Sequence, residues 1–150
     1  MDKPTGALLG YGAMVILAVA GLAWAMRAVS HDEAAWCRRV FAGLAAGRLY
    51  VQGDVNWERL KALGADVGED YRALPNERER ANFRRAFITR FASSFQGAKG
   101  RVQDFTGWRS QGRDDEGRLI VAVDYPAKQQ TLLVTVSELG QRRVDALQWQ

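Results

Sequence analysis

The chain has 150 residues, 47% of them hydrophobic and 25% charged, and its formal net charge is +4 at pH 7. One cysteine, Cys37, and one histidine, His31, exclude an intrachain disulfide and, within one chain, a cysteine-based zinc site or a histidine-rich metal site. The basic excess is small and no dense block of Lys or Arg occurs, so we expect no nucleic-acid partner, no structural metal and no cofactor.

The first feature along the chain is an uncharged segment, residues 7–26, which reads ALLGYGAMVILAVAGLAWAM. About 20 apolar residues at about 1.5 Å each match a hydrocarbon core of about 30 Å. The segment predicts a transmembrane helix, with residues 1–29 as a membrane anchor in the lipid bilayer and residues 30–150 as a soluble domain. Two alternatives stay open: a signal peptide cleaved near residues 23–25, and a buried core helix.

Glycines in and beside this segment predict how it packs, and the charged residues around it predict its orientation. Gly6 and Gly10 have the Gly-xxx-Gly spacing that lets membrane helices approach closely, so both are candidate helix-packing residues, with a plain anchor as the alternative. Counting Lys and Arg slightly favours a cytoplasmic domain, but the very short N-terminal tail resembles a signal-anchor. We expect a single-pass protein of a bacterial inner membrane with an exported, periplasmic domain.

Three helices are predicted after the apolar segment. Ser30 and Glu33 have the spacing of a capping box, which predicts a helix start there, although no proline prevents the preceding helix from running straight on. A short second helix is predicted from residue 56 to Gly64, with Trp57, Leu60 and Leu63 facing inward. Residues 65–74 are predicted to be loop or weak helix.

The third helix, residues 77–96, has the clearest pattern. Asn76 and Glu79 form a second capping pattern, and Gly97 predicts the C-terminal end. Four phenylalanines recur every four residues along one face: Phe83, Phe87, Phe91 and Phe95. We expect Phe87 and Phe91 to be buried between this helix and a sheet. A groove for a cofactor or lipid is the alternative.

After Gly97 the apolar residues alternate with polar ones, which is typical of β-strands. Strands are predicted over residues 102–110, 118–125, 130–138 and 142–149. Because the connections are short, consecutive strands should be antiparallel neighbours. The sequence therefore predicts an α+β fold in which an N-terminal transmembrane helix precedes about three helices packed on a four-stranded antiparallel meander.

This order of elements, over roughly residues 31–150, resembles the cone-shaped α+β folds of the NTF2-like and cystatin-like groups. Membrane-anchored members of such groups include the VirB8-like assembly proteins of secretion machines. The resemblance implies one curved sheet covered by helices on one face. Enzymatic NTF2-like members use an Asp–His pair, and the only histidine here is His31, so we expect no catalytic residues.

Several charged or reactive side chains are candidates for a site. Arg84 falls inside the aromatic stripe of the third helix with Arg80 one turn earlier, so both are candidate ligand-binding residues for an anion or carboxylate. Solvated arginines and a structural ion pair are the alternatives. Three strand carboxylates, Asp104, Asp124 and Asp145, are predicted to face solvent. Cys37, beside Trp36, is predicted to be a small buried residue.

These observations favour a non-catalytic protein: a single-pass membrane-anchored accessory or assembly subunit of a membrane complex. Trp108 and Trp149 are candidate partner-binding residues, because Trp is favoured at interface hot spots. Other complex subunits are the expected partners, and a homo-oligomer is possible. The alternative is a module that binds a small ligand or a lipid headgroup in the cone interior with Arg84. A carboxylate-only enzyme is the third hypothesis.

Overall fold

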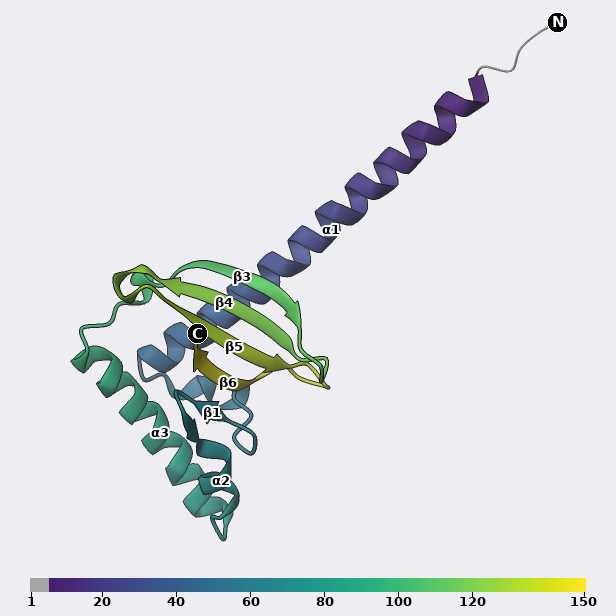
Figure 1. The fold of residues 1–150 in the computed structure, drawn as a ribbon. Helices are drawn as coiled ribbons and strands as arrows, with labels where there is room; N and C mark the ends of the chain where they lie inside the picture. Colours follow the sequence, from purple (N-terminus) through teal and green to yellow (C-terminus); the bar gives the residue numbers. More distant parts are fainter. Residues whose placement is uncertain (1–5) are drawn as a thin grey trace, which may run out of the picture.

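The structure is a computed structural model that describes the backbone of residues 6–150 and the side chains of residues 19–26 and 32–150. Figure 1 shows a long helix that projects from a curved sheet, with a second long helix beyond the inner side of the sheet. The elements in chain order are α1 (Gly6–Ala45), the 3₁₀ helix η1 (Leu49–Asp54), β1 (Lys61–Ala62), β2 (Ala65–Asp66), α2 (Val67–Arg72), α3 (Glu77–Gly97), η2 (Val102–Asp104), β3 (Thr106–Arg113), β4 (Leu119–Tyr125), η3 (Pro126–Lys128), β5 (Gln130–Ser137) and β6 (Arg143–Trp149).

The sheet has six strands in the order β2-β1-β6-β5-β4-β3. Neighbours are antiparallel except β1 and β6, which are parallel, so the sheet is mixed. The α+β class was predicted correctly, but the four-stranded antiparallel sheet is wrong. The difference arises at Leu63 and Gly64, which take φ angles of 51° and 91° and turn the chain into a small hairpin. Lys61 then pairs with Ala146 of β6.

The same turn makes the predicted second helix wrong. Trp57 and Leu60 are buried as expected, but Leu63 lies at the turn and is exposed. The segment that follows, predicted as loop or weak helix, contains the short helix α2, capped by the Asp66 side chain, which accepts from the Glu69 N–H at 3.0 Å.

No helix that is long and apolar enough to cross a membrane occurs in the part of the chain that the structure describes. Within the predicted span, only residues 19–26 have described side chains. The absence of such a helix among the described residues contradicts the predicted transmembrane helix and signal-anchor. It also contradicts the predicted single-pass location in an inner membrane with a periplasmic domain. Gly6 and Gly10 lie outside the residues with described side chains.

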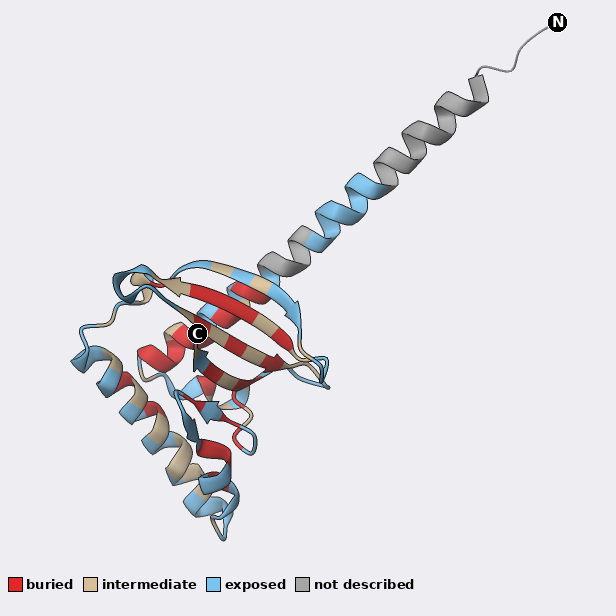
Figure 2. Ribbon diagram, in the orientation of Figure 1, coloured by how far each residue is buried: buried red, intermediate tan, exposed pale blue. Residues whose placement is uncertain are grey.

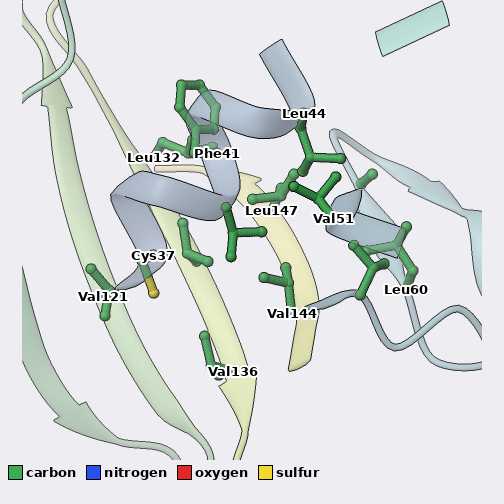
Figure 3. Close-up of a cluster of buried hydrophobic side chains, with 14 of the residues drawn as sticks. Cys37, Phe41, Leu44, Val51, Leu60, Val121, Leu132, Val136, Val144 and Leu147 are labelled. Carbon is green, nitrogen blue, oxygen red and sulfur yellow. The ribbon is translucent and has the colours of Figure 1, made fainter. Parts of the chain in front are cut away.

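Helix α1 runs without a break from residue 6 to residue 45, so no new helix begins at Ser30. Its C-terminal part lies against the inner face of the sheet, where burial concentrates on both elements (Figure 2). Cys37, Val40, Phe41 and Leu44 form its buried stripe. Figure 3 shows side chains of this stripe against Val121, Leu132, Val136, Val144 and Leu147 of the strands. This contact forms the centre of the core.

Helix α3 lies on α1 and η1 rather than on the sheet. Its start and end are as predicted: the Asn76 side chain accepts from the Glu79 N–H at 3.0 Å, and the helix stops at Gly97. The burial of Phe87 and Phe91 between helix and sheet is wrong. Both are half-buried, with ring centroids 5.5 Å from Trp57 and 6.3 Å from Phe41 respectively, because α1 already occupies the inner face of the sheet.

Gly43 lets η1 approach α1 closely. A Cβ at Gly43 would lie 2.3 Å from Cγ1 of Val51, a side chain with no exposed surface. A real Cβ contact at that distance cannot persist, so η1 would have to move. The glycine that weakens α1 as an isolated helix is therefore required for its packing.

We predict that Gly43→Ala lowers the melting temperature by several degrees. Helix propensity alone would favour the alanine by about 1 kcal/mol, whereas overpacking costs about 1–3 kcal/mol. Gly53→Ala is the matched control, because a Cβ at Gly53 would have nothing within 4 Å and the φ of Gly53 is not positive. Thermal denaturation followed by circular dichroism decides it, and a Gly43→Ala variant that melts at or above wild type contradicts the packing argument.

Candidate functional site

The Arg84 guanidinium makes three hydrogen bonds within the protein. It donates to the Tyr71 hydroxyl at 2.6 Å, the Glu77 carboxylate at 2.7 Å and the Gln52 side-chain oxygen at 3.2 Å. The hydrogen bond to Glu77 raises the pKa of Arg84 above its ordinary value. A hollow of about 320 Å³ adjoins Arg84, and each of the three guanidinium nitrogens already donates one hydrogen bond within the protein. The geometry is that of a structural ion pair.

Arg80 lies one turn before Arg84, as the sequence predicted. Its guanidinium carbon is 5.6 Å from the centroid of the Tyr71 ring, which is a cation–π arrangement. Its Nε is buried without a hydrogen-bond partner among the side chains that the structure describes. Tyr71 thus connects the two arginines, and both hold α2 against α3.

Trp108 and Trp149 are half-buried and pack on the core at their inner edges. The Trp108 Nε1–H donates to the Phe105 carbonyl at 3.2 Å, which fixes the indole. Trp149 lies 6.2 Å from Tyr125 between ring centroids, in a small hollow of about 150 Å³. Each tryptophan therefore has one packed side and one side that faces a depression in the surface.

The three carboxylates predicted on strands do not come together, and the predicted strand over residues 102–110 is wrong at its start, because Asp104 lies in η2 and β3 begins at Thr106. Asp104 pairs with Arg101 at 2.9 Å. Asp124 pairs with Arg109 at 2.8 Å, and the hydrogen bond from Arg109 lowers the pKa of the Asp124 carboxyl. Each of these two carboxylates has an arginine of its own. No group of three His, Cys, Asp or Glu side chains that could hold a metal occurs in the described residues.

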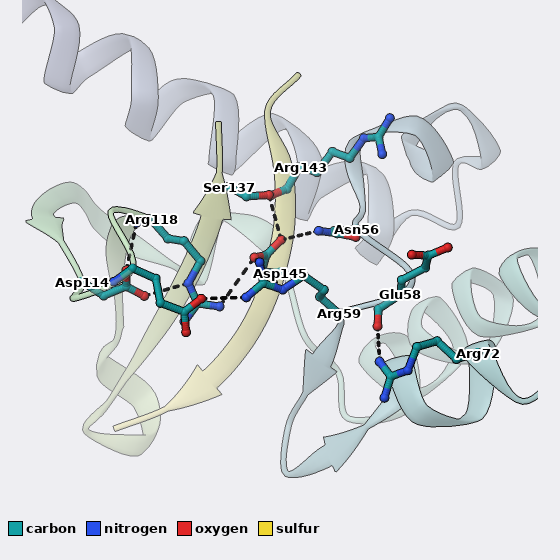
Figure 4. A network of polar contacts seen from close by, with 10 residues as sticks. Asn56, Glu58, Arg59, Arg72, Asp114, Arg118, Ser137, Arg143 and Asp145 are labelled. Carbon is teal, nitrogen blue, oxygen red and sulfur yellow. Dashed lines mark hydrogen bonds and ion pairs between the residues drawn. The ribbon is translucent and has the colours of Figure 1, made fainter. Parts of the chain in front are cut away.

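Asp145 is only 1% exposed, so its predicted solvent-facing position is wrong. The pairing of β5 with β6 shifts between Thr135, which pairs with Ala146, and Val136, which pairs with Val144. Asp145 is the extra residue of β6 at this shift. Figure 4 shows its carboxylate accepting hydrogen bonds from Asn56 at 3.0 Å and Ser137 at 2.9 Å. The spacing of buried Val144 and Leu147, three residues apart rather than two, is the sequence signal of this bulge.

Two arginines complete the Asp145 cluster. Arg118 Nη1 lies 3.5 Å and Arg59 Nε 3.9 Å from the second carboxylate oxygen of Asp145. The same arginines pair with Glu116 on the β3–β4 connection. The buried carboxylate therefore holds the β3–β4 hairpin, the β5–β6 bulge and the segment before β1 together.

We predict that Asp145→Ala destabilises the domain by about 1.5–3 kcal/mol, the usual contribution of a hydrogen bond to a charged group. Asn56 and Ser137 would lose their shared acceptor, and Arg59 and Arg118 would lose a nearby opposite charge. Asp115→Ala, the same chemical change at an exposed position of the neighbouring connection, should leave the stability unchanged. Urea denaturation measures both variants, and equal midpoints would show that the buried cluster contributes nothing.

A hollow with a volume of about 680 Å³ lies between α1 and the start of β3. We call it the α1–β3 groove. It is lined by Ala34, Ala35, Arg38, Arg39, Ala42, Gln103, Phe105, Thr106, Gly107 and Trp108. Its size is within the range of ligand sites. Of the predicted site residues, it contains Trp108.

The groove combines a small apolar floor with positive charge. On α1 its lining residues recur at helical spacing on the face opposite buried Cys37: Ala35, Arg38, Arg39 and Ala42. Arg38 and Arg39 are exposed, and neither pairs with a carboxylate among the described side chains. The sequence prediction counted Arg38 and Arg39, with Arg27, only as the basic residues on the domain side of the predicted anchor, because the packing of α1 beside β3 is not visible in the sequence.

Cys37 lies on the buried face of the same helix, as predicted, and is 1% exposed. Burial raises the pKa of its thiol from 9.0 to about 12. The thiolate is the reactive form of cysteine, so this side chain is chemically protected while the domain is folded.

We predict that iodoacetamide at pH 8 labels Cys37 negligibly in the folded protein and completely in denaturing urea. Intact-mass measurement follows the labelling. Because the thiol is released only by opening of the α1–sheet contact, Gly43→Ala should label faster than Gly53→Ala. Complete labelling of the native protein within minutes would contradict the buried position.

No family model, curated protein or solved structure matches this chain. The resemblance to NTF2-like, cystatin-like and VirB8-like proteins, which rested on the order of the elements, stays a prediction.

Proposed function

We propose that this protein is a non-catalytic assembly subunit that binds other proteins through helix α1. The observation that carries the proposal is the uncovered apolar surface of α1 beyond the sheet. Val19, Leu22, Trp24 and Met26 are each more than three-fifths exposed, and Trp24 reaches 75%. In Figure 2 this part of the helix is separate from the domain, with no other described element beside it.

Uncovered side chains of this size are unfavourable in water. Burying apolar surface is worth about 25 cal/mol per Å², so a partner that covers this stretch gains binding free energy. Large exposed apolar patches commonly mark interaction sites. The stretch is regular helix, which a partner helix or groove can contact without reordering the backbone.

The alternative, a small-ligand module that uses Arg84, is less well supported. Each nitrogen of the Arg84 guanidinium already donates to Tyr71, Glu77 or Gln52, so a ligand that uses the whole guanidinium would have to displace these hydrogen bonds. The domain core is filled by α1, with Phe41 in contact with four other aromatic rings. A filled core with exposed apolar surface favours protein binding over ligand storage.

Site-specific photo-crosslinking in the cells that make the protein tests the proposal. A photoreactive phenylalanine analogue replaces Leu22 or Trp24 in the full chain, and Arg85 on the exposed face of α3 in the control. We expect discrete crosslinked species from the two α1 positions and none from position 85.

The mass of each crosslinked species identifies the partner, and a species of twice the chain mass would identify a homo-oligomer. Either result supports an assembly role. If irradiation yields no discrete species from positions 22 and 24, or the same species from position 85, the proposed function is wrong.

A further inference from the structure

We infer that the α1–β3 groove binds a short, acidic, extended segment of a partner protein. This inference deepens the proposed function and rests on it for the class of partner, but it concerns a different surface from residues 19–26. Three observations support it: unpaired positive charge among the described side chains, a shallow apolar floor, and a strand edge with no neighbouring strand in the described sheet.

The charge of the groove is available to a partner. Nearby arginines are neutralised within the domain: Arg101 by Asp104 and Arg109 by Asp124. Arg38 and Arg39 have no such carboxylate among the described side chains, and both are exposed. Two arginines on consecutive residues, without carboxylate partners among the described side chains, favour a carboxylate-bearing partner, because arginine binds carboxylates in a two-pronged geometry.

The floor of the groove fits side chains rather than a phosphate. Ala34, Ala35 and Ala42 are small side chains on the α1 side, and Phe105 and the half-buried ring of Trp108 also line the groove. The Trp108 indole N–H already donates to Phe105, so its ring offers the groove an apolar face. A segment with apolar and acidic residues in alternation would place one set on this floor and the other against the arginines.

Strand β3 forms the last strand of the sheet, beside β4 only. Most of its side chains are exposed. An unpaired strand edge offers backbone donors and acceptors to an added strand. Register shifts between Thr106 and Arg109 and between Ser110 and Gly112 bend this edge, so only a short segment can pair with it.

Gly107 allows the backbone of β3 to bend beside the groove. Its φ is +67°, and a Cβ there would lie 3.1 Å from the Asp124 carboxylate and 3.4 Å from Arg109. A side chain at this position would strain the backbone and press on the Arg109–Asp124 pair. The bend in β3 beside the groove therefore depends on a glycine.

Selection from a random heptapeptide library displayed on phage, with the purified full chain as bait, tests the inference. We expect the enriched peptides to be acidic with alternating apolar residues. The best peptide, made synthetically with a fluorophore, is then titrated against wild type, Arg38→Glu/Arg39→Glu and the control Arg78→Glu/Arg85→Glu. Starting from a formal charge of +4, each double variant reaches 0.

Charge reversal in the groove should weaken peptide binding at least about tenfold, while the control pair on the exposed face of α3 should change it less than about twofold. Raising the salt concentration should weaken binding to wild type. Proline at the centre of the peptide should also weaken it, because proline cannot pair as a strand. Both double variants are first shown to melt like wild type.

Three results would overturn the inference: no peptide is enriched, the enriched peptides lack acidic residues, or the two double variants bind equally. The comparison of the two double variants depends on the groove and leaves residues 19–26 unchanged. Loss of crosslinking at positions 22 and 24 therefore tests the assembly role, and the peptide titration tests the groove. If nucleic acid rather than acidic peptide bound the wild type and not the groove variant, the proposed partner class would be wrong.

Discussion

The packing of α1 on the inner face of the sheet determines where the other elements lie. Phe41 is its central side chain, with ring centroids 4.8 Å from Phe105, 5.7 Å from Trp108 and 5.8 Å from Phe95. Because α1 fills this face, α3 can only form an outer layer, and its phenylalanines remain half-buried. Edge-to-face contacts between these rings join the two helical layers, so removal of Phe41 would affect both.

A second constraint acts at the edge of the core, through charge instead of apolar contact. Asp145 is buried at the bulge in β6 and accepts hydrogen bonds from Asn56 and Ser137. A buried carboxylate without partners would be strongly unfavourable, so the bulge is stable only with these donors and the nearby arginines in place. The Asp145 cluster thereby favours the single register that aligns Val136 with Val144.

The sequence predicted elements with strong local signals. The Asn76 cap, the end of α3 at Gly97, and the positions of β4, β5 and β6 to within a residue or two all follow from capping and alternation. The two-residue strands β1 and β2 were missed because Lys61 pairs with Ala146 far along the chain, and such pairing has no local pattern. The groove was missed for the same reason: Arg38 and Trp108 are 70 positions apart, and only the α1–β3 contact joins them.

Helix α1 thus presents three distinct surfaces along and around its axis. Residues 19–26 are exposed and apolar, the Phe41 face builds the core, and Arg38 and Arg39 lie on the other side of the same turns. Because Arg38 and Arg39 are exposed and lack carboxylate partners among the described side chains, changing them removes no core contact. Substitutions at Arg38 and Arg39 can therefore change the binding of a partner without changing the stability of the domain.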